Sequence, residues 1–322
     1  MGFWLRRLSR LVVVLICVSF FSYLLLDLLP GDPVTTIAAF APTSVRERLK
    51  HDAKLDQPIP VQYWNWLSKF ARGDLGNYYR SSGVDKVSAD VGNSLPVSLQ
   101  LMLYSMILTV LLAIPLGVFS SYWAGTWFDR AINATAFGAI AVPDFALGLL
   151  LAYFVGVKLG WLPTSGYVHP TDASQGGLPE HFKHMVLPSV SLAVGQIAGY
   201  MRLLRSDMIA TLQEDFITMA KAKGMPSRRI LWRHALRPSS LTLLTVAGLN
   251  VGALIGGAVV IEVVFQLPGM GFLLATNIRA QQFIAVQSIV AILAIGYVFV
   301  NTLIDLLYVK LDPRVRSVSV AG

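Results

Sequence analysis

The chain has 322 residues, of which 55% are hydrophobic and only 14% are charged, and its mean hydropathy is +0.61. Soluble domains carry about a quarter charged residues, so this composition favours a protein embedded in a lipid bilayer and excludes a disordered chain. The formal net charge of +8 is therefore interpreted as membrane topology and not as nucleic-acid binding. One cysteine and five histidines, without an HExxH or CxxC pattern, predict no metal site.

Six stretches of roughly 20 or more mostly apolar residues are long enough to cross a bilayer as helices. They cover approximately residues 8–29, 96–123, 131–157, 185–204, 239–265 and 284–309. The sequence therefore predicts an all-α polytopic membrane protein with six transmembrane helices. The first stretch also fits a cleaved export signal, but no small-x-small cleavage site follows it, and we expect it to be retained.

The distribution of basic residues predicts the orientation of these helices. Fifteen of the 26 Lys and Arg residues fall on one side of the spans, in the N-terminal end, the link after the second span, the segment 202–237 and the C-terminal tail. The shorter loops of the opposite side hold three. Because basic residues favour the cytoplasmic side, both termini are expected to be cytoplasmic in a multi-pass protein of the cell membrane.

These features divide the chain into four parts. Residues 1–29 form the cytoplasmic N-terminus and the first helix, and residues 30–95 form a small extracytoplasmic domain. Residues 96–309 contain helices two to six with a cytoplasmic coupling loop at 206–238, and residues 310–322 form a cytoplasmic tail.

Aromatic residues are concentrated in the expected extracytoplasmic domain. Tyr63, Trp64 and Trp66 lie in an amphipathic stretch over residues 61–70, which is expected to be a short helix. They could line the headgroup level of the membrane or form a small core for the domain. The sequence leaves both interpretations open.

The most informative segment lies between the fourth and fifth spans and begins at residues 214–224. It is expected to form a short helix that Asp215 caps and that Gly224 ends in the left-handed conformation. Pro226 interrupts before a second, basic helix over residues 228–237. Such a pair makes a rigid protrusion that a partner can approach closely. A surface loop held by anionic lipid is the alternative.

The protrusion carries a family motif. Its run AKAKG at residues 220–224, followed by Arg228-Arg229 and by HALR at residues 234–237, resembles the EAA coupling loop of binding-protein-dependent ATP-binding-cassette (ABC) importers, in the form found in peptide-transporter permeases. Thr218 and Met219 replace the Glu and Ala of the general motif.

The resemblance extends over nearly the whole chain. Motifs shared with the B-type dipeptide and oligopeptide permeases occur in the same order at 29–33 (LPGDP), 55–58 (LDQP), 73–76 (GDLG), 114–117 (IPLG), 160–163 (GWLP), 257–262 (GAVVIE), 268–271 (PGMG) and 312–314 (DPR). The resemblance implies the type I ABC importer permease fold and import of a dipeptide or oligopeptide. Glutathione or a nickel chelate is the alternative cargo within the family.

The family also implies a division of labour among subunits. This chain would be a non-catalytic permease, paired with a second homologous permease, two ATP-binding cassette domains and an extracytoplasmic substrate-binding protein. ATP and Mg²⁺ would bind to the ATPase subunits and no cofactor to this chain, which has no GxxxxGK[ST] phosphate loop. The residues implied in coupling to the ATPases are Asp215, Phe216, Ala220, Lys221, Ala222, Lys223, Gly224, Arg228 and Arg229.

Candidates for the transport pathway follow from charge and from small residues. Asp144 and Glu262 are acidic residues at or near membrane depth, where such residues usually face a bundle interior or a watery cavity. They could attract cargo or form a gate, or they could make structural hydrogen bonds. Gly248, Gly252 and Gly256 recur every four residues, which permits close helix approach either to the second permease or within this subunit.

Two other classes of protein were weighed. A secondary transporter needs no ATPase partner and typically shows an internally repeated set of spans, which the sequence lacks. An intramembrane enzyme would need a nucleophile and base or a metal pair, and neither HExxH nor GxSxG is present. No catalytic residue is therefore assigned.

Overall fold

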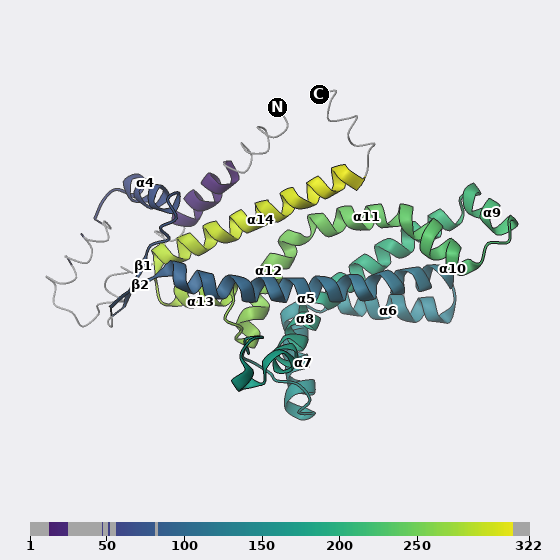
Figure 1. Ribbon diagram of the computed structural model, residues 1–322, viewed down its shortest axis with the longest axis horizontal. Helices are drawn as coiled ribbons and strands as arrows, with labels where there is room; N and C mark the ends of the chain where they lie inside the picture. The colour runs from purple at the N-terminus through teal and green to yellow at the C-terminus, as the bar shows by residue number, and fades with distance from the viewer. Residues whose placement is uncertain (1–12, 25–46, 48–50, 52–55, 81–82, 312–322) are drawn as a thin grey trace, which may run out of the picture. The chain divides into compact units, whose positions relative to one another are not determined.

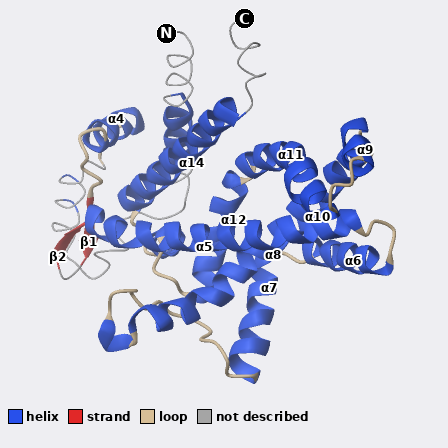
Figure 2. Ribbon diagram, turned by 45° about the vertical axis from the view of Figure 1, so that its right-hand side comes forward, coloured by secondary structure: helices blue, strands red, loops and turns tan. Residues whose placement is uncertain are grey.

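The computed structural model describes residues 13–24, 47, 51, 56–80 and 83–311. The chain divides into two compact units, one formed by Met1–Ser98 and Pro268–Phe299 and the other by Leu99–Leu267 and Val300–Gly322. Figure 1 gives the order of the elements, and Figure 2 shows that nearly all of them are helices.

The first unit combines short helices with one β-hairpin and the beginnings of two long helices. Its elements are Val13–Leu24, α4 (Ile59–Phe70), β1 (Asn77–Arg80), β2 (Gly83–Lys86), α13 (Met270–Arg279), and the first parts of α5 (Val87–Tyr122) and α14 (Phe283–Leu311). The strands pair antiparallel, with Tyr78 opposite Asp85. Over the residues that the structure describes, the regular elements are thus helical apart from one hairpin, which the all-α expectation did not include.

The aromatic residues of α4 form part of a core in this unit. Tyr63 and Trp66 are buried against Ala291 of α14, and the Trp66 Nε1 donates a hydrogen bond to the Ser288 Oγ at 3.0 Å. Trp64 points away and is 68% exposed. Tyr63 and Trp66 are thus buried in a core that they share with α14 and with the helix Val13–Leu24, and that is not confined to residues 30–95.

The GDLG motif at residues 73–76 makes the turn into the hairpin. Gly76 has φ +86, and its N–H donates to the Asp74 carboxylate at 3.0 Å. A Cβ at Gly76 would collide with the Ile284 side chain. The motif is explained by this close approach and by a backbone conformation that only glycine adopts easily.

The second unit is built around one long helix, α8. In chain order, the elements of this unit are the end of α5, α6 (Trp127–Ala141), α7 (Asp144–Leu151), the π-helical turn η1 (Ala152–Lys158), the 3₁₀ turn η2 (Ala173–Gln175), α8 (Gly177–Leu212), α9 (Asp215–Ala222), α10 (Ser227–Arg229), the π-helical turn η3 (Ile230–Ala235), α11 (Leu236–Leu249), α12 (Val251–Phe265) and the end of α14. Helix α8 packs against α6, α7, α11 and α12. Its buried side chains, among them Leu204 and Met208, form the centre of the core.

The expected membrane spans appear in altered form. Among the described residues, α5 and Phe283–Leu303 of α14 are each long and apolar enough to cross a membrane alone. Two bent helix pairs are long and apolar enough only when each pair is taken together. The first pair is Trp127–Ala141 with Asp144–Lys158, bent by 102°, and the second is Ser227–Gly248 with Gly252–Phe265. The expected fourth span lies inside the longer α8, and the first lies partly outside the described residues.

The bend in the third span has a local cause. Val142 and Pro143 are extended, with ψ of 124° and 141°, between the end of α6 and the start of α7. Proline lacks an N–H and disfavours helical geometry in the residue before it. The apolar stretch 131–157, which the sequence predicts to be one continuous span, therefore consists of two helices.

Candidate functional site

Helix α9 forms the tip of the segment 206–238, which the sequence predicts to be a coupling loop and which keeps that name below. It begins at Asp215, as an eight-residue helix, but the residue at the N-cap position is Glu214, and no side chain there makes a capping hydrogen bond. The expectation that Asp215 caps the helix is therefore wrong. Its carboxylate lies in the first turn, where it still complements the positive end of the helix dipole.

The other end of α9 closes as the sequence predicts. Gly224 has φ +72, and its N–H donates to the Lys221 carbonyl at 2.9 Å, while the Met225 N–H donates to the Ala220 carbonyl at 3.2 Å. These two bonds make the Schellman motif, which satisfies carbonyls that the last helical turn leaves unpaired. The chain reverses sharply here, so that α10 starts only three residues later, at Ser227.

Helix α9 is anchored by its inner face. Ile217 is fully buried and Ala220 nearly so, and both belong to the core that includes Ile230 and Leu231 of η3. Ala220 was expected to contact a partner. Its burial gives it instead an anchoring role, because close contact with η3 needs a small side chain.

The outer face of α9 combines apolar and basic side chains. Phe216 and Met219 are 43% and 60% exposed, one helical turn apart. The other exposed residues of the expected coupling set are Asp215, Lys221, Ala222, Lys223, Gly224, Arg228 and Arg229. Met219, which the sequence marks only as a departure from the family motif, is more exposed than Phe216 on this face of α9.

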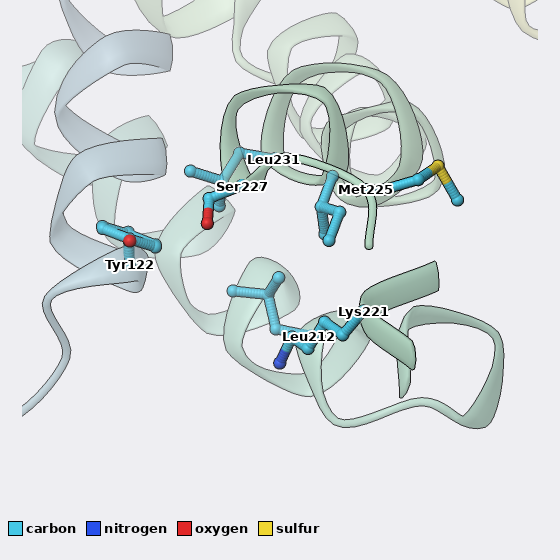
Figure 3. Close-up of a pocket in the computed structure, with 7 residues that line it drawn as sticks. Tyr122, Leu212, Lys221, Met225, Ser227 and Leu231 are labelled. Atoms are coloured by element: carbon cyan, nitrogen blue, oxygen red, sulfur yellow. The ribbon is translucent and has the colours of Figure 1, made fainter. Parts of the chain in front are cut away.

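A pocket of about 290 Å³ lies beneath the tip of the coupling loop (Figure 3). Tyr122 of α5 and Leu212 of α8 line one part of it, and Lys221, Met225, Ser227, Ile230 and Leu231 line the rest. The tip is therefore packed firmly through Ile217 but leaves space beside α5. Helix α9 contacts η3 and α8 directly.

The second helix of the coupling loop differs from the expectation of a separate helix over residues 228–237. Helix α10 runs through the π-helical turn η3 into α11 without a break, and Pro238 lies in the first turn of α11. A π-helical turn shifts the hydrogen-bond pattern just before the proline, which has no N–H to contribute. The coupling loop is consequently continuous with the fifth predicted span.

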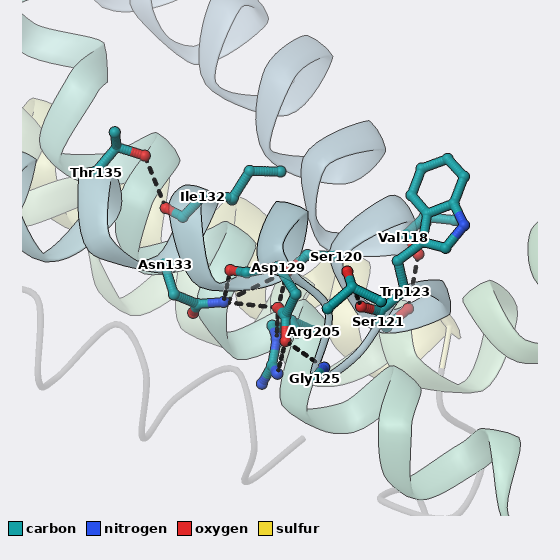
Figure 4. A network of polar contacts seen from close by, with 11 residues as sticks. Val118, Ser120, Ser121, Trp123, Gly125, Asp129, Ile132, Asn133, Thr135 and Arg205 are labelled. Atoms are coloured by element: carbon teal, nitrogen blue, oxygen red, sulfur yellow. Dashed lines mark hydrogen bonds and ion pairs between the residues drawn. The ribbon is translucent and has the colours of Figure 1, made fainter.

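A buried ion pair joins the start of α6 to α8 (Figure 4). The Arg205 Nε and Nη2 each donate to one oxygen of the Asp129 carboxylate at 2.6 Å. The Ser120 hydroxyl, the Gly125 N–H and the Asn133 amide supply three further bonds of 2.6–2.8 Å to the same carboxylate. Asp129 is 3% exposed, so these five donors compensate for its removal from water.

Asp144 occupies a narrow space at the start of α7. A Cβ placed on Gly195 of α8 would come within 3.1 Å of its Oδ1, and one on Gly257 of α12 within 3.7 Å of its Oδ2. Within the described part of the chain no hydrogen bond or ion pair engages this half-buried carboxylate. The two glycines thus make room for an acidic group next to the broken span.

Helix α8 also carries unpartnered polar atoms along one face. The Ser189 hydroxyl, the Gln196 carbonyl oxygen and one carboxylate oxygen of Asp207 are buried and lack hydrogen-bond partners among the described residues. Spacings of 7 and 11 residues place these three side chains on one face of the helix. A buried polar atom without a partner is costly, so these three atoms call for water or another polar group along this face of α8.

The remaining predicted residues are Glu262 and three glycines, which lie on α11 and α12. Glu262 is buried near the end of α12. Gly248 belongs to α11, whereas Gly252 and Gly256 belong to α12, so the three do not share one straight helix. A Cβ at Gly256 would meet nothing within 4 Å, whereas one at Gly257 would come within 2.8 Å of the Leu192 side chain. Gly257 is the glycine that permits close packing inside the unit.

His181 and His184, in the first turns of α8, contact the backbone of the loop before that helix, and His169 lies in the loop itself. The His181 Nδ1 lies 2.7 Å from the Val168 carbonyl, and the His184 Nδ1 lies 3.1 Å from the Gly166 carbonyl. His169 contacts the Thr171 hydroxyl at 2.8 Å. These contacts give each histidine a structural partner in the loop.

Comparison with known families matches residues 113–317 to the model of binding-protein-dependent transport system inner membrane components. The chain belongs to this family. Residues 1–83 match the separate model of its N-terminal membrane component. The two matches together extend over the coupling loop, the broken span and the first unit's N-terminal segment.

Relatives are similar along almost their full length. The chain is 37% identical, over 97% of its length and 98% of the relative's, to a protein named as a peptide transport system permease in Brucella abortus (strain 2308). It is 35% identical over the same shares to a protein named as a peptide ABC transporter permease in Sinorhizobium fredii. A glutathione transport system permease of Pectobacterium atrosepticum is 32% identical, over 98% of this chain and 99% of the relative.

Proposed function

We propose that this chain is the transmembrane permease subunit of an ATP-driven ABC importer for peptides and forms half of its translocation pathway. The similarity to peptide permeases over 97% of the chain carries this proposal. The proposal includes six transmembrane helices, cytoplasmic termini and an extracytoplasmic domain at residues 30–95. The excess of basic residues on the side of the coupling loop supports that orientation.

Coupling to the ATPases is assigned to the outer face of α9. Each of the two ATPase domains would contact one permease, here through Phe216 and Met219 with the surrounding lysines and arginines. ATP binding would bring the ATPase domains together, and the buried contacts of Ile217 and Ala220 would transmit the movement to η3 and α8. A ligand shifts a conformational equilibrium only by the difference between its affinities for the two conformations. Transport therefore requires that the ATPase domains contact α9 differently in the two conformations of the permease.

The pathway is assigned to the polar side of the helices around Asp144. Its unpartnered carboxylate would attract the ammonium group of a peptide, and the polar face of α8 would be hydrated when the pathway opens. Glu262 would belong to the outer gate. The open surface at Gly256 supports a seam between this permease and the second one.

Copurification tests the coupling assignment. The permease, expressed with its partner subunits, carries Met219→Glu, which puts a charge into the exposed apolar patch of α9. Recovery of the ATPase subunits should fall about tenfold, as for loss of an interface residue that contributes about 1.4 kcal/mol to binding. Val61→Glu, an exposed apolar position of α4, is the matched control and should recover wild-type amounts. Equal recovery from both variants would refute the assignment.

Transport assays test the cargo and the energy source. Proteoliposomes with the complete importer and its binding protein should accumulate a labelled dipeptide or oligopeptide only when ATP is supplied on the side of the coupling loop. Preference for glutathione over peptides would select the alternative cargo. Uptake that continues without ATP would favour a secondary transporter.

A further inference from the structure

The second unit contains an open hollow of about 690 Å³ between α6 and α8. Three arginines line it, Arg130 at the start of α6 and Arg202 and Arg205 on α8. Asp129 and Asn133 lie beside them. We call this surface the arginine hollow, and neither the coupling loop nor the transport pathway uses it.

Two of the three arginines lack an acidic counter-charge. The Asp129 carboxylate binds Arg205 side-on, because it accepts hydrogen bonds from the Arg205 Nε and Nη2 (Figure 4). The other guanidinium N–H groups of Arg205 make no bond to Asp129. Within the described part of the chain, Arg130 and Arg202 form no ion pair. The hollow therefore has a local charge of about +2 after Asp129 is counted against Arg205.

An aromatic ring, and not an acidic side chain, holds Arg202 in position. Its guanidinium carbon lies 3.9 Å from the centre of the Phe137 ring, in a cation–π contact that orients the planar group. Arg130, Asn133 and Phe137 share one face of α6, because three, four and seven residues separate them. Donors from two helices thus converge on one space, and a tetrahedral anion such as a phosphate accepts several planar N–H donors at once.

The surroundings identify the level of the membrane at which the hollow lies. Tyr122, Trp123 and Trp127 are exposed and pack in a chain of ring contacts immediately before Asp129. Exposed tyrosine and tryptophan collect at the headgroup level of a bilayer. On the other side of the hollow α6 exposes Phe137 and Ile140, which suit acyl chains. The arginines therefore lie where lipid phosphates are found.

We propose that the arginine hollow binds the phosphate of an anionic phospholipid, with Arg130 and Arg202 as the ligands and the Asp129–Arg205 pair as their fixed support. The lipid belongs to the leaflet on the side of the coupling loop. Its assignment to the cytoplasmic leaflet rests on the proposed function, whereas the binding itself does not.

Lipid binding to the purified full-length permease tests the proposal directly. Native mass spectrometry would compare phosphatidylglycerol with phosphatidylcholine of identical acyl chains. Each basic residue near an anionic headgroup contributes about fivefold, so Arg202→Gln should weaken phosphatidylglycerol binding about fivefold. The double variant Arg130→Gln, Arg202→Gln should weaken it about 25-fold. Arg205 stays unchanged, because its loss would leave buried Asp129 without its cation.

Matched variants separate a charge site from a folding defect. Arg72→Gln removes an equal charge from an exposed position and should keep wild-type lipid affinity. Arg130→Lys with Arg202→Lys retains the charge and should recover most of the affinity that the glutamine variants lose, although the planar contact with Phe137 is gone. An equal loss in the lysine variant would mark a folding defect and overturn the proposal.

Three further outcomes would overturn it. Equal binding of the two lipids to the wild type would show that the phosphate charge is irrelevant. Full displacement of phosphatidylglycerol by millimolar inorganic phosphate would make the hollow a soluble-anion site. Loss of the second permease from the double variant, with lipid binding unchanged, would make it a protein interface. Lipid binding is measured without uptake or ATP. Failure of the lipid proposal would therefore not count against the proposed transport function, which the transport assays test separately.

Discussion

The coupling loop and the arginine hollow both concentrate charged residues, but they differ in whether those residues are exposed or buried and paired. In the coupling loop the lysines and arginines are exposed, and none of them forms an ion pair among the described residues. In the hollow, Asp129 is buried and receives five hydrogen bonds. The coupling loop instead buries apolar residues, of which Ile217 is the most enclosed.

This difference separates two kinds of mutational effect. Exposed charges contribute little to folding stability, because water screens them, but they influence the rate and salt dependence of association. A buried charge that loses its partner costs several kcal/mol. Substitutions that break the buried Asp129–Arg205 pair should therefore act on folding, and substitutions on the outer face of α9 should act on assembly.

The largest effect is expected from breaking the buried ion pair. Arg205→Gln leaves the Asp129 carboxylate buried with three neutral donors, and should lower the free energy of unfolding by about 3 kcal/mol. Chemical denaturation in detergent measures the change. The double variant Asp129→Asn, Arg205→Gln removes both charges and should be clearly more stable than Arg205→Gln alone. If the single variant matches the wild type, the pair is not structural.

The next effect contrasts neighbouring residues of α9. Ile217→Ala opens a cavity under the helix and should lower the free energy of unfolding by about 2–4 kcal/mol, detected as faster proteolysis of the coupling loop. Phe216→Ala removes a half-exposed ring and should leave proteolysis unchanged while it weakens ATPase copurification. Identical behaviour of the two variants would remove the distinction between the anchoring face and the docking face.

A smaller effect is expected at the end of α9. Gly224→Val forces a β-branched residue into φ +72 and should cost about 1–2 kcal/mol, so that the coupling loop forms but changes its angle. ATP hydrolysis should continue while uptake per ATP falls. Gly224→Asn is the control, because asparagine tolerates the left-handed region. Normal uptake by the valine variant would mean that the Schellman turn plays no part in coupling.

Local patterns in the sequence were enough to predict several elements. Gly224 ends α9 because the need for a left-handed residue is local, and the helices carrying the spans follow from apolar length. Helix α5 begins at Val87, nine residues before the predicted boundary, because its first turns are polar and hydropathy does not register a helix that extends into water. The mostly helical fold and the end of α9 at Gly224 were thus accessible.

Long-range contacts were not accessible in the same way. Asp129 and Arg205 are 76 residues apart, and the sequence indicates only that Arg205 is one of many basic residues on one side. The cradle around Asp144 depends on Gly195 and Gly257, whose importance appears only when three helices meet. The periodic Gly248, Gly252 and Gly256 attracted attention instead, although the chain breaks between α11 and α12 within that series.

The smallest change in stability is expected at Asp144, where a substitution should instead reduce transport. Asp144→Asn keeps the shape that the cradle accommodates, so the free energy of unfolding should change by less than about 1 kcal/mol while peptide uptake falls several-fold. Gly195→Ala tests the same site from α8, because its Cβ would press on the Asp144 carboxylate without removing the charge. Gly138→Ala, where a Cβ meets nothing within 4 Å, should transport normally. If Asp144→Asn transports normally while Gly195→Ala only destabilises the protein, the carboxylate is a packing element of the bent span and the polar face of α8 must be explained without it.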